Sequence, residues 1–254
     1  MSLFSQIADA YQRTKKPKDI VWNRFVARPL AAVPLVLLAK SRITPNQVTF
    51  SSLACFVAAA GLLVGLPGHA GLLIAIAVLE LSYVLDCVDG QLARLRGSSS
   101  PVGAHLDFLM DELKAFMLVA ATGARLWRGD GQIQWLVESL AGLVVVASAI
   151  SLTTFIRRAE YLQATGAARP RSAGDYGDGF ANAAVPARPT SLPARAVGLV
   201  ESLGRFLIHY PSYLVFVAVA NRLDIFLHVY LAINAAYAAR TMLAIVRKLG
   251  RRAA

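Results

Sequence analysis

The sequence predicts an all-α, polytopic membrane protein with six transmembrane helices and an N-terminal amphipathic helix in the membrane interface. Two features of composition favour this class: 56% of the 254 residues are hydrophobic and only 16% are charged, whereas a soluble domain carries about 25% charged residues. The third feature is that the apolar residues gather in runs close to the ~20 residues that a helix needs to cross a bilayer. A soluble helical core, the minor alternative, would need polar helix faces that these runs lack.

The six predicted spans are residues 48–66, 71–86, about 108–127, 133–156, 206–220 and 225–246. The second and fifth are short, so we expect their ends to extend into polar flanks. Residues 25–39 form a seventh apolar run, which contains Pro29 and Pro34, and each proline removes a helix hydrogen bond. We interpret this run as a broken amphipathic helix lying in the interface. A seventh span is the alternative, and it would place the two termini on opposite faces.

The net charge of +11 indicates nucleic acid or an anionic membrane surface as a partner. The basic residues lie in loops between apolar runs, so we expect membrane lipids and no nucleic acid. They gather before residue 46, after the second span, in residues 157–205 and in the tail, while the opposite loops hold only Arg125, Arg128 and Arg222. The positive-inside rule therefore places both termini and the 157–205 loop in the cytoplasm.

This pattern divides the chain into an N-terminal cytoplasmic or interfacial segment (1–43), a six-helix membrane domain (44–247) and a cytoplasmic tail (248–254). The first 20 residues are polar and predict no signal peptide. Residues 163–193 are rich in Ala, Gly, Pro and Arg, which predicts an irregular loop. Cys55 and Cys87 are expected to be small buried hydrophobes without a disulfide.

Acidic residues cluster where the second and third spans approach each other. Six of the fifteen lie in this region: Glu80, Asp86, Asp89, Asp107, Asp111 and Glu112. An ionised carboxylate in hydrocarbon costs on the order of several kcal/mol unless it is paired or bound to a metal. Asp86 and Asp89 are three residues apart and Asp107 and Asp111 four apart, so each pair shares a helix face.

The residues between the two aspartate pairs include Gly, Ser and Pro, which favour a turn. Two antiparallel helices would then point four carboxylates at one another, and such hard oxygen ligands suit Mg²⁺ or Mn²⁺. The alternative is a structural ion-pair network or a proton relay. His105 does not share a helix face with Asp107, so we exclude it. Lys114, one turn beyond Asp111, either pairs with an aspartate or faces lipid headgroups.

The full pattern is Asp86-x-x-Asp89-Gly90-x-x-Ala93-Arg94, eight residues, then Gly103-x-x-x-Asp107-x-x-x-Asp111. It resembles the signature of the CDP-alcohol phosphotransferase (CDP-alcohol phosphatidyltransferase) family at every fixed position. Chance agreement at these positions is below about one in a million at background residue frequencies. The string from Thr44 to Thr49 also looks like the family's Pro-Asn-x-x-Thr start to its first membrane helix.

The resemblance implies six transmembrane helices, a homodimer and a polar cavity open to the cytoplasm. It implies that two ions of Mg²⁺ or Mn²⁺ are held by aspartates, with the last also acting as the catalytic base. These metal ligands are Asp86, Asp89, Asp107 and Asp111, and the base is Asp111. It further implies a substrate-binding set in which the glycines and alanine leave room and the arginine meets the diphosphate: Asn46, Gly90, Ala93, Arg94 and Gly103.

The function that follows is transfer of a substituted phosphate group from a CDP-alcohol to an acceptor hydroxyl, with release of CMP. We expect CDP-diacylglycerol as donor and a small alcohol or lipid as acceptor, in phospholipid biosynthesis at the cytoplasmic (inner) membrane with the active site facing the cytoplasm. A CDP-amino-alcohol or CDP-inositol donor is the alternative within the family, and the string from Gly97 to Gly103 looks like the amino-alcohol branch. The rival class is an ion-coupled membrane transporter, which would not need Gly90, Ala93, Arg94 and Gly103.

Overall fold

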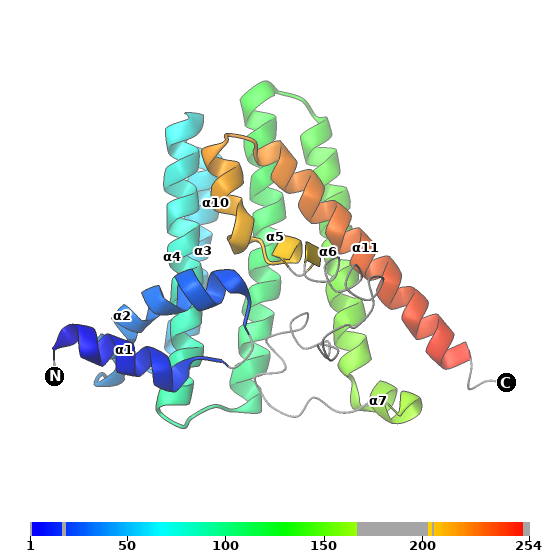
Figure 1. The fold of residues 1–254 in the computed structure, drawn as a ribbon. Coiled ribbons are helices and arrows are strands. Elements are labelled where there is room, and N and C mark those ends of the chain that lie inside the picture. Colours follow the sequence, from blue (N-terminus) through cyan, green and yellow to red (C-terminus); the bar gives the residue numbers. More distant parts are fainter. Residues whose placement is uncertain (1, 17–18, 167–202, 205, 251–254) are drawn as a thin grey trace, which may run out of the picture. The chain divides into compact units, whose positions relative to one another are not determined.

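The computed structural model describes residues 2–16, 19–166, 203–204 and 206–250, and every regular element among them is helical (Figure 1). The predicted all-α class is therefore confirmed. In chain order the elements are α1 (Leu3–Thr14), the π-helical turn η1 (Asn23–Ala27), α2 (Arg28–Ala39), α3 (Pro45–Gly65), α4 (Gly68–Leu95), α5 (Pro101–Asp130), α6 (Gln134–Arg157), α7 (Ala159–Thr165), α10 (Pro211–Val219) and α11 (Leu223–Gly250).

Four of the described helices are long and apolar enough to cross a membrane: α3, α4, α6 and α11. They cover the predicted spans 48–66, 71–86, 133–156 and 225–246. Apolar side chains on them face outward, with Val57, Ile74 and Val144 exposed by 52%, 52% and 63%. Lipid is a favourable surrounding for such a surface. The chain is therefore a polytopic membrane protein.

The other two predicted spans differ from this pattern. Helix α5 is 30 residues long and covers residues 108–127, but charged residues interrupt its first half. Helix α10 has nine residues and covers only part of 206–220. Residues 206–208 are helical and the helix is interrupted at His209 and Tyr210, directly before Pro211, which cannot donate to the carbonyl one turn earlier. The number of six spans stays a prediction.

The segment before α3 is more regular than the sequence predicts. Residues 3–14 form helix α1, which we did not expect in a polar stretch. The expected breaks at Pro29 and Pro34 are absent, because η1 runs directly into α2. Pro29 lies in the first turn of α2, after the widened π-helical turn, where a missing N–H is tolerated. Whether residues 25–39 lie on the membrane stays a prediction.

The chain folds as two compact units, one up to Lys114 and one from Ala115 onward. In the first unit, α3 packs along α4, and α1 and α2 pack against α4 as well (Figure 1). The shared core is made of small and branched apolar side chains: Ala10, Ala27, Ala31, Leu35, Val48, Cys87, Val88 and Leu92. Polar contacts add to it, since the Tyr83 hydroxyl donates to Asn23 Oδ1 at 2.5 Å.

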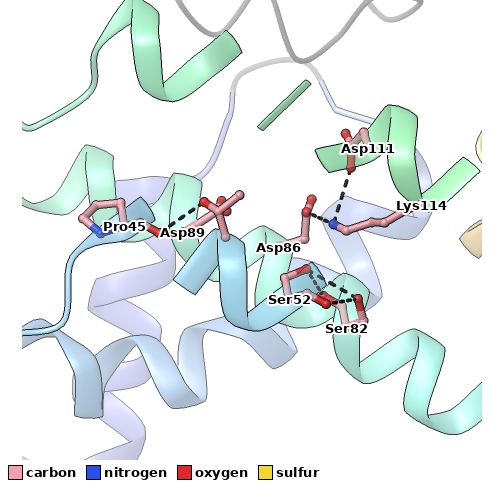
Figure 2. Close-up of polar contacts among 8 residues, drawn as sticks. Pro45, Ser52, Ser82, Asp86, Asp89, Asp111 and Lys114 are labelled. Atoms are coloured by element: carbon pink, nitrogen blue, oxygen red, sulfur yellow. Dashed lines mark hydrogen bonds and ion pairs between the residues drawn. The ribbon is translucent and has the colours of Figure 1, made fainter. Parts of the chain in front are cut away.

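The α3–α4 hairpin is held in register by two buried serines. Ser52 Oγ donates to the Ser82 carbonyl at 2.9 Å, and Ser82 Oγ donates to the Ser52 carbonyl at 2.8 Å (Figure 2). Each hydroxyl thereby satisfies its hydrogen bonding between the two helices, as polar groups inside a membrane require.

The turn between α4 and α5 matches the predicted turn chemistry. Gly97 adopts φ 62°, and the amides of Ser98 and Gly97 donate to the carbonyls of Ala93 and Arg94 at 2.9 and 3.2 Å. This is the Schellman pattern that ends many helices. Ser100 Oγ then accepts from the Gly103 amide at 3.0 Å, so it caps the start of α5. The chain reverses within residues 96–100.

In the second unit, α6 packs against α11, α7 contacts both, and α10 packs on α11. Phe226 lies between Tyr213 and Tyr230, with ring centroids 5.6 and 5.4 Å away. The predicted cytoplasmic loop 157–205 contains the short helix α7 near its start. Most of the predicted irregular stretch 163–193, including Gly174 to Gly179, lies outside the described residues. Cys55 and Cys87 are both free thiols; Cys87 is buried as predicted, whereas Cys55 is only half-buried.

Arg96 stabilises the entry to α3. Its guanidinium donates to the carbonyls of Leu38, Ser41 and Ile43 at 2.7, 2.8 and 2.5 Å. We predict that Arg96→Ala lowers the free energy of unfolding by about 1–3 kcal/mol, because the three carbonyls lose the guanidinium as a donor. Thermal unfolding of the purified protein in detergent measures this. Arg42→Ala, a nearby exposed arginine, is the control, and equal melting temperatures for both variants would contradict the assignment.

Candidate metal and nucleotide site

Three of the four predicted aspartate ligands come together in the structure. Asp86 and Asp89 on α4 and Asp107 on α5 each offer a carboxylate oxygen, and these oxygens all lie within 4.8 Å of one another. Asp111 is not in this triad. Its side chain is 45% exposed, whereas that of Asp86 is 12% exposed. The triad is therefore mostly enclosed, and Asp111 is more accessible than Asp86.

The triad fits a divalent cation. Asp107 Oδ1 is buried and accepts no hydrogen bond from the described residues, and a buried acceptor without a donor is unfavourable. Close carboxylates also repel one another. A small, hard cation bound by oxygen ligands would relieve both costs. The residues present could thus hold Mg²⁺ or Mn²⁺.

Thr49 orients one member of the triad. Its hydroxyl donates to Asp89 Oδ2 at 2.5 Å, and both side chains are buried. The start of α3 places it there, because Thr44 accepts from the Gln47 amide at 3.3 Å and Gln47 Oε1 accepts from the Thr44 amide at 2.9 Å. This capping box, with Pro45 in the first turn, fixes where the helix begins. The sequence pointed to this string without assigning a role to Thr49.

Asn46 and Gly103, two predicted substrate-binding residues far apart in sequence, lie beside each other. A Cβ atom on Gly103 would lie 3.7 Å from Asn46 Oδ1 and 3.2 Å from Ser100 Oγ. A Cβ atom at residue 103 would therefore crowd the Ser100 hydroxyl and would touch Asn46 at an ordinary van der Waals distance. The structure brings together the first turns of α3 and α5 at this point.

Arg94 and Gly90 form a second pair. Arg94 Nε donates to the Thr14 carbonyl at 2.9 Å, which caps the end of α1. A Cβ atom on Gly90 would lie 3.3 Å from Arg94 Nη1, so the glycine leaves room for the guanidinium. The role predicted for Arg94 at a diphosphate stays a prediction, as does the role of the half-buried Ala93.

Lys114 completes the cluster, and the first of its two predicted alternatives is found. Its ammonium forms an ion pair with Asp86 and lies 3.5 Å from Asp111 Oδ1 (Figure 2). The lysine side chain is 1% exposed, so it is enclosed among the carboxylates. His105 is exposed and outside the triad.

A family model described as CDP-alcohol phosphatidyltransferase matches residues 42–172, which is about half of the chain. The chain belongs to the CDP-alcohol phosphatidyltransferase family. It is also similar to a phosphatidylinositol phosphate synthase of Corynebacterium glutamicum, with 32% identity over 133 residues, 52% of this chain and 55% of that protein. The chain thus spans about half the length of this curated relative.

The residues of the CDP-alcohol phosphatidyltransferase signature fall into two groups in the structure, the aspartates of the triad and the glycines that lie beside polar side chains. Asp86, Asp89 and Asp107 form the enclosed triad. Gly90 makes space for Arg94, and Gly103 makes space beside Asn46. At both glycines an added Cβ atom would closely approach a polar side-chain atom, Arg94 Nη1 at 3.3 Å from residue 90 and Ser100 Oγ at 3.2 Å from residue 103.

We predict that Thr49→Val weakens Mn²⁺ binding by about 10-fold, because Asp89 loses the hydrogen bond that orients it while the side-chain shape is kept. Titration of purified protein followed by electron paramagnetic resonance of free Mn²⁺ measures this. Ser51→Ala is the matched control, since its hydroxyl bonds only its own helix at Gln47, at 2.9 Å. An equal change in both variants would show that Thr49 does not act through Asp89.

Proposed function

We propose that this protein transfers a substituted phosphate group from a CDP-alcohol to an acceptor hydroxyl and releases CMP. The observation that carries the proposal is the enclosed triad of carboxylates beside the more accessible Asp111. Two ions of Mg²⁺ or Mn²⁺, held by Asp86, Asp89 and Asp107 with Asp111 completing the site, would neutralise the donor diphosphate and the charge on departing CMP. Membership of the family supports this proposal.

In the proposed reaction, the acceptor oxygen forms a bond to the phosphorus that carries the donor alcohol. The bond from that phosphorus to the bridging oxygen of CMP breaks, and CMP leaves with the electron pair. Asp111 takes the proton of the acceptor hydroxyl as general base, which its greater exposure allows. Arg94 binds the diphosphate, while Asn46, Gly90, Ala93 and Gly103 border the nucleotide.

For the donor and acceptor we favour CDP-diacylglycerol and a phosphorylated small alcohol such as inositol phosphate. The name of the Corynebacterium relative, a phosphatidylinositol phosphate synthase, supports this choice. The excess of basic residues, with a net charge of +11, also suits an anionic acceptor. CDP-inositol and CDP-amino-alcohol donors are the alternatives.

The string from Gly97 to Gly103 is weak support for an amino-alcohol donor. Gly97 supplies the left-handed residue of the turn, Ser100 caps α5 and Pro101 begins it. These residues are accounted for by the turn itself, whatever the donor. The proposed setting is the cytoplasmic membrane with the site facing the cytoplasm, in a homodimer, on the basis of the loop charges and the family resemblance.

We predict that CMP release requires Mg²⁺ or Mn²⁺ and is abolished by EDTA. In one set of assays the purified protein receives CDP-diacylglycerol with inositol phosphate, glycerol phosphate or serine as acceptor. In a second set the donor is CDP-inositol, or a CDP-amino-alcohol with diacylglycerol as acceptor. We expect the highest rate with CDP-diacylglycerol and a phosphorylated acceptor. Full activity in EDTA would overturn the metal site, and no CMP release from any pair by metal-loaded protein would overturn the function.

We predict that Asp111→Asn separates chemistry from donor binding. Turnover should fall about 100- to 10,000-fold with the loss of a general base, while the triad still binds metal and donor. Asp89→Asn removes a member of the triad, so metal and donor affinity should fall with it. Calorimetry of donor binding beside turnover compares the two. If Asp111→Asn loses donor binding as severely as Asp89→Asn, Asp111 is mainly a ligand.

A further inference from the structure

Lys114 is a cation enclosed in the acidic cluster. It lies on α5 one turn beyond Asp111, and its ammonium reaches across to Asp86 on α4 (Figure 2). Residue 114 is not one of the eight fixed residues of the signature. Its lysine therefore has no role among the proposed metal ligands or as the general base. With 1% of its side chain exposed, the ammonium can be accommodated only through pairing with carboxylates.

Asp86 belongs to two groups at once. It is a member of the triad with Asp89 and Asp107, and its Oδ1 is also the partner of Lys114. A divalent cation at the triad and the ammonium of Lys114 would therefore both draw on Asp86. Two cations that share a carboxylate in a poorly solvated site repel each other, which weakens the binding of the exchangeable one.

We propose that Lys114 is a built-in counter-ion of the metal site, which keeps Asp86 and Asp111 together when no divalent cation is bound and competes with that cation for Asp86. This proposal rests on the metal site proposed above. It makes Lys114 a positioning residue, because it acts through Asp86 and Asp111. It also predicts that the site binds its metal more weakly than the same carboxylates would alone, so that the cation can exchange.

The first test compares a single and a double charge-removing variant of the metal-free protein, which we call the charge cycle. The measured quantity is the melting temperature. Lys114→Met keeps an unbranched side chain but removes the charge, so we expect a lower melting temperature because the carboxylates lose their cation. Adding Asp86→Asn to Lys114→Met removes the unbalanced charge and should recover most of the loss. If Lys114→Met alone does not fold, a folded double variant supports the proposal, and loss of both variants overturns it.

The second test is Mn²⁺ affinity, followed by the same resonance titration. Lys114→Met should bind Mn²⁺ about 10-fold more tightly than the unaltered protein, because the competing cation is gone. Lys114→Arg keeps the charge and is the control, so it should not show the tighter Mn²⁺ binding expected of Lys114→Met. Equal or weaker binding by folded Lys114→Met would show that the ammonium does not compete with the metal, and would overturn the proposal.

The two tests separate this proposal from the proposed function. The charge cycle needs neither metal nor donor, so its failure leaves the CMP-release assay standing. The charge cycle and tight Mn²⁺ binding by Lys114→Met could both be observed while the protein releases no CMP from any donor. That result would support the counter-ion role of Lys114 and overturn the proposed transferase function.

Discussion

The structure of the first unit depends on the electrostatic cost of gathering carboxylates between α4 and α5. Like charges this close repel, and helices embedded in a membrane cannot relieve the repulsion with bulk water. Two compensating groups are visible, since Thr49 donates to Asp89 and Lys114 pairs with Asp86. Asp107 Oδ1, buried without a donor among the described residues, offers a place for a third. Because these groups come from α3, α4 and α5, the cluster forms only when the three helices have packed.

Residues with no reactive chemistry determine where the reactive ones lie. The capping box at Thr44 begins α3, and Ser100 begins α5. These two starts bring Asn46 beside Gly103. The guanidinium of Arg96, at the end of α4, binds the main chain that leads into α3. The positions of the site residues thus depend on where each helix begins or ends. These helix ends are determined by local features of the sequence.

Local features are also what the sequence could predict. Apolar runs gave the long helices, the three- and four-residue spacings gave the aspartate faces, and Gly, Ser and Pro gave the turn. The contacts that were not predicted join residues far apart: Thr14 with Arg94 and Thr49 with Asp89 are 80 and 40 residues apart. The pairing of Lys114 with an aspartate was predicted only as one of two alternatives, and its partner Asp86, 28 residues away, was not named. The periodicity of apolar and polar residues does not predict such pairings, because they depend on how the helices pack. Helix α1 was missed for a related reason, since its buried side holds only Ala10 and Thr14.

Gly90 shows how a signature position can be understood differently once its neighbours are known. From the sequence, its missing side chain suggested room for a nucleotide. In the structure the nearest atom to a Cβ there is Arg94 Nη1, at 3.3 Å, so the glycine first makes room for the arginine. The arginine is held in turn by the Thr14 carbonyl at the end of α1. Helix α1 lies outside the family match, which begins at residue 42. Arg94, a signature residue inside the matched range, therefore contacts a segment outside it, and its Nε is oriented by the end of helix α1.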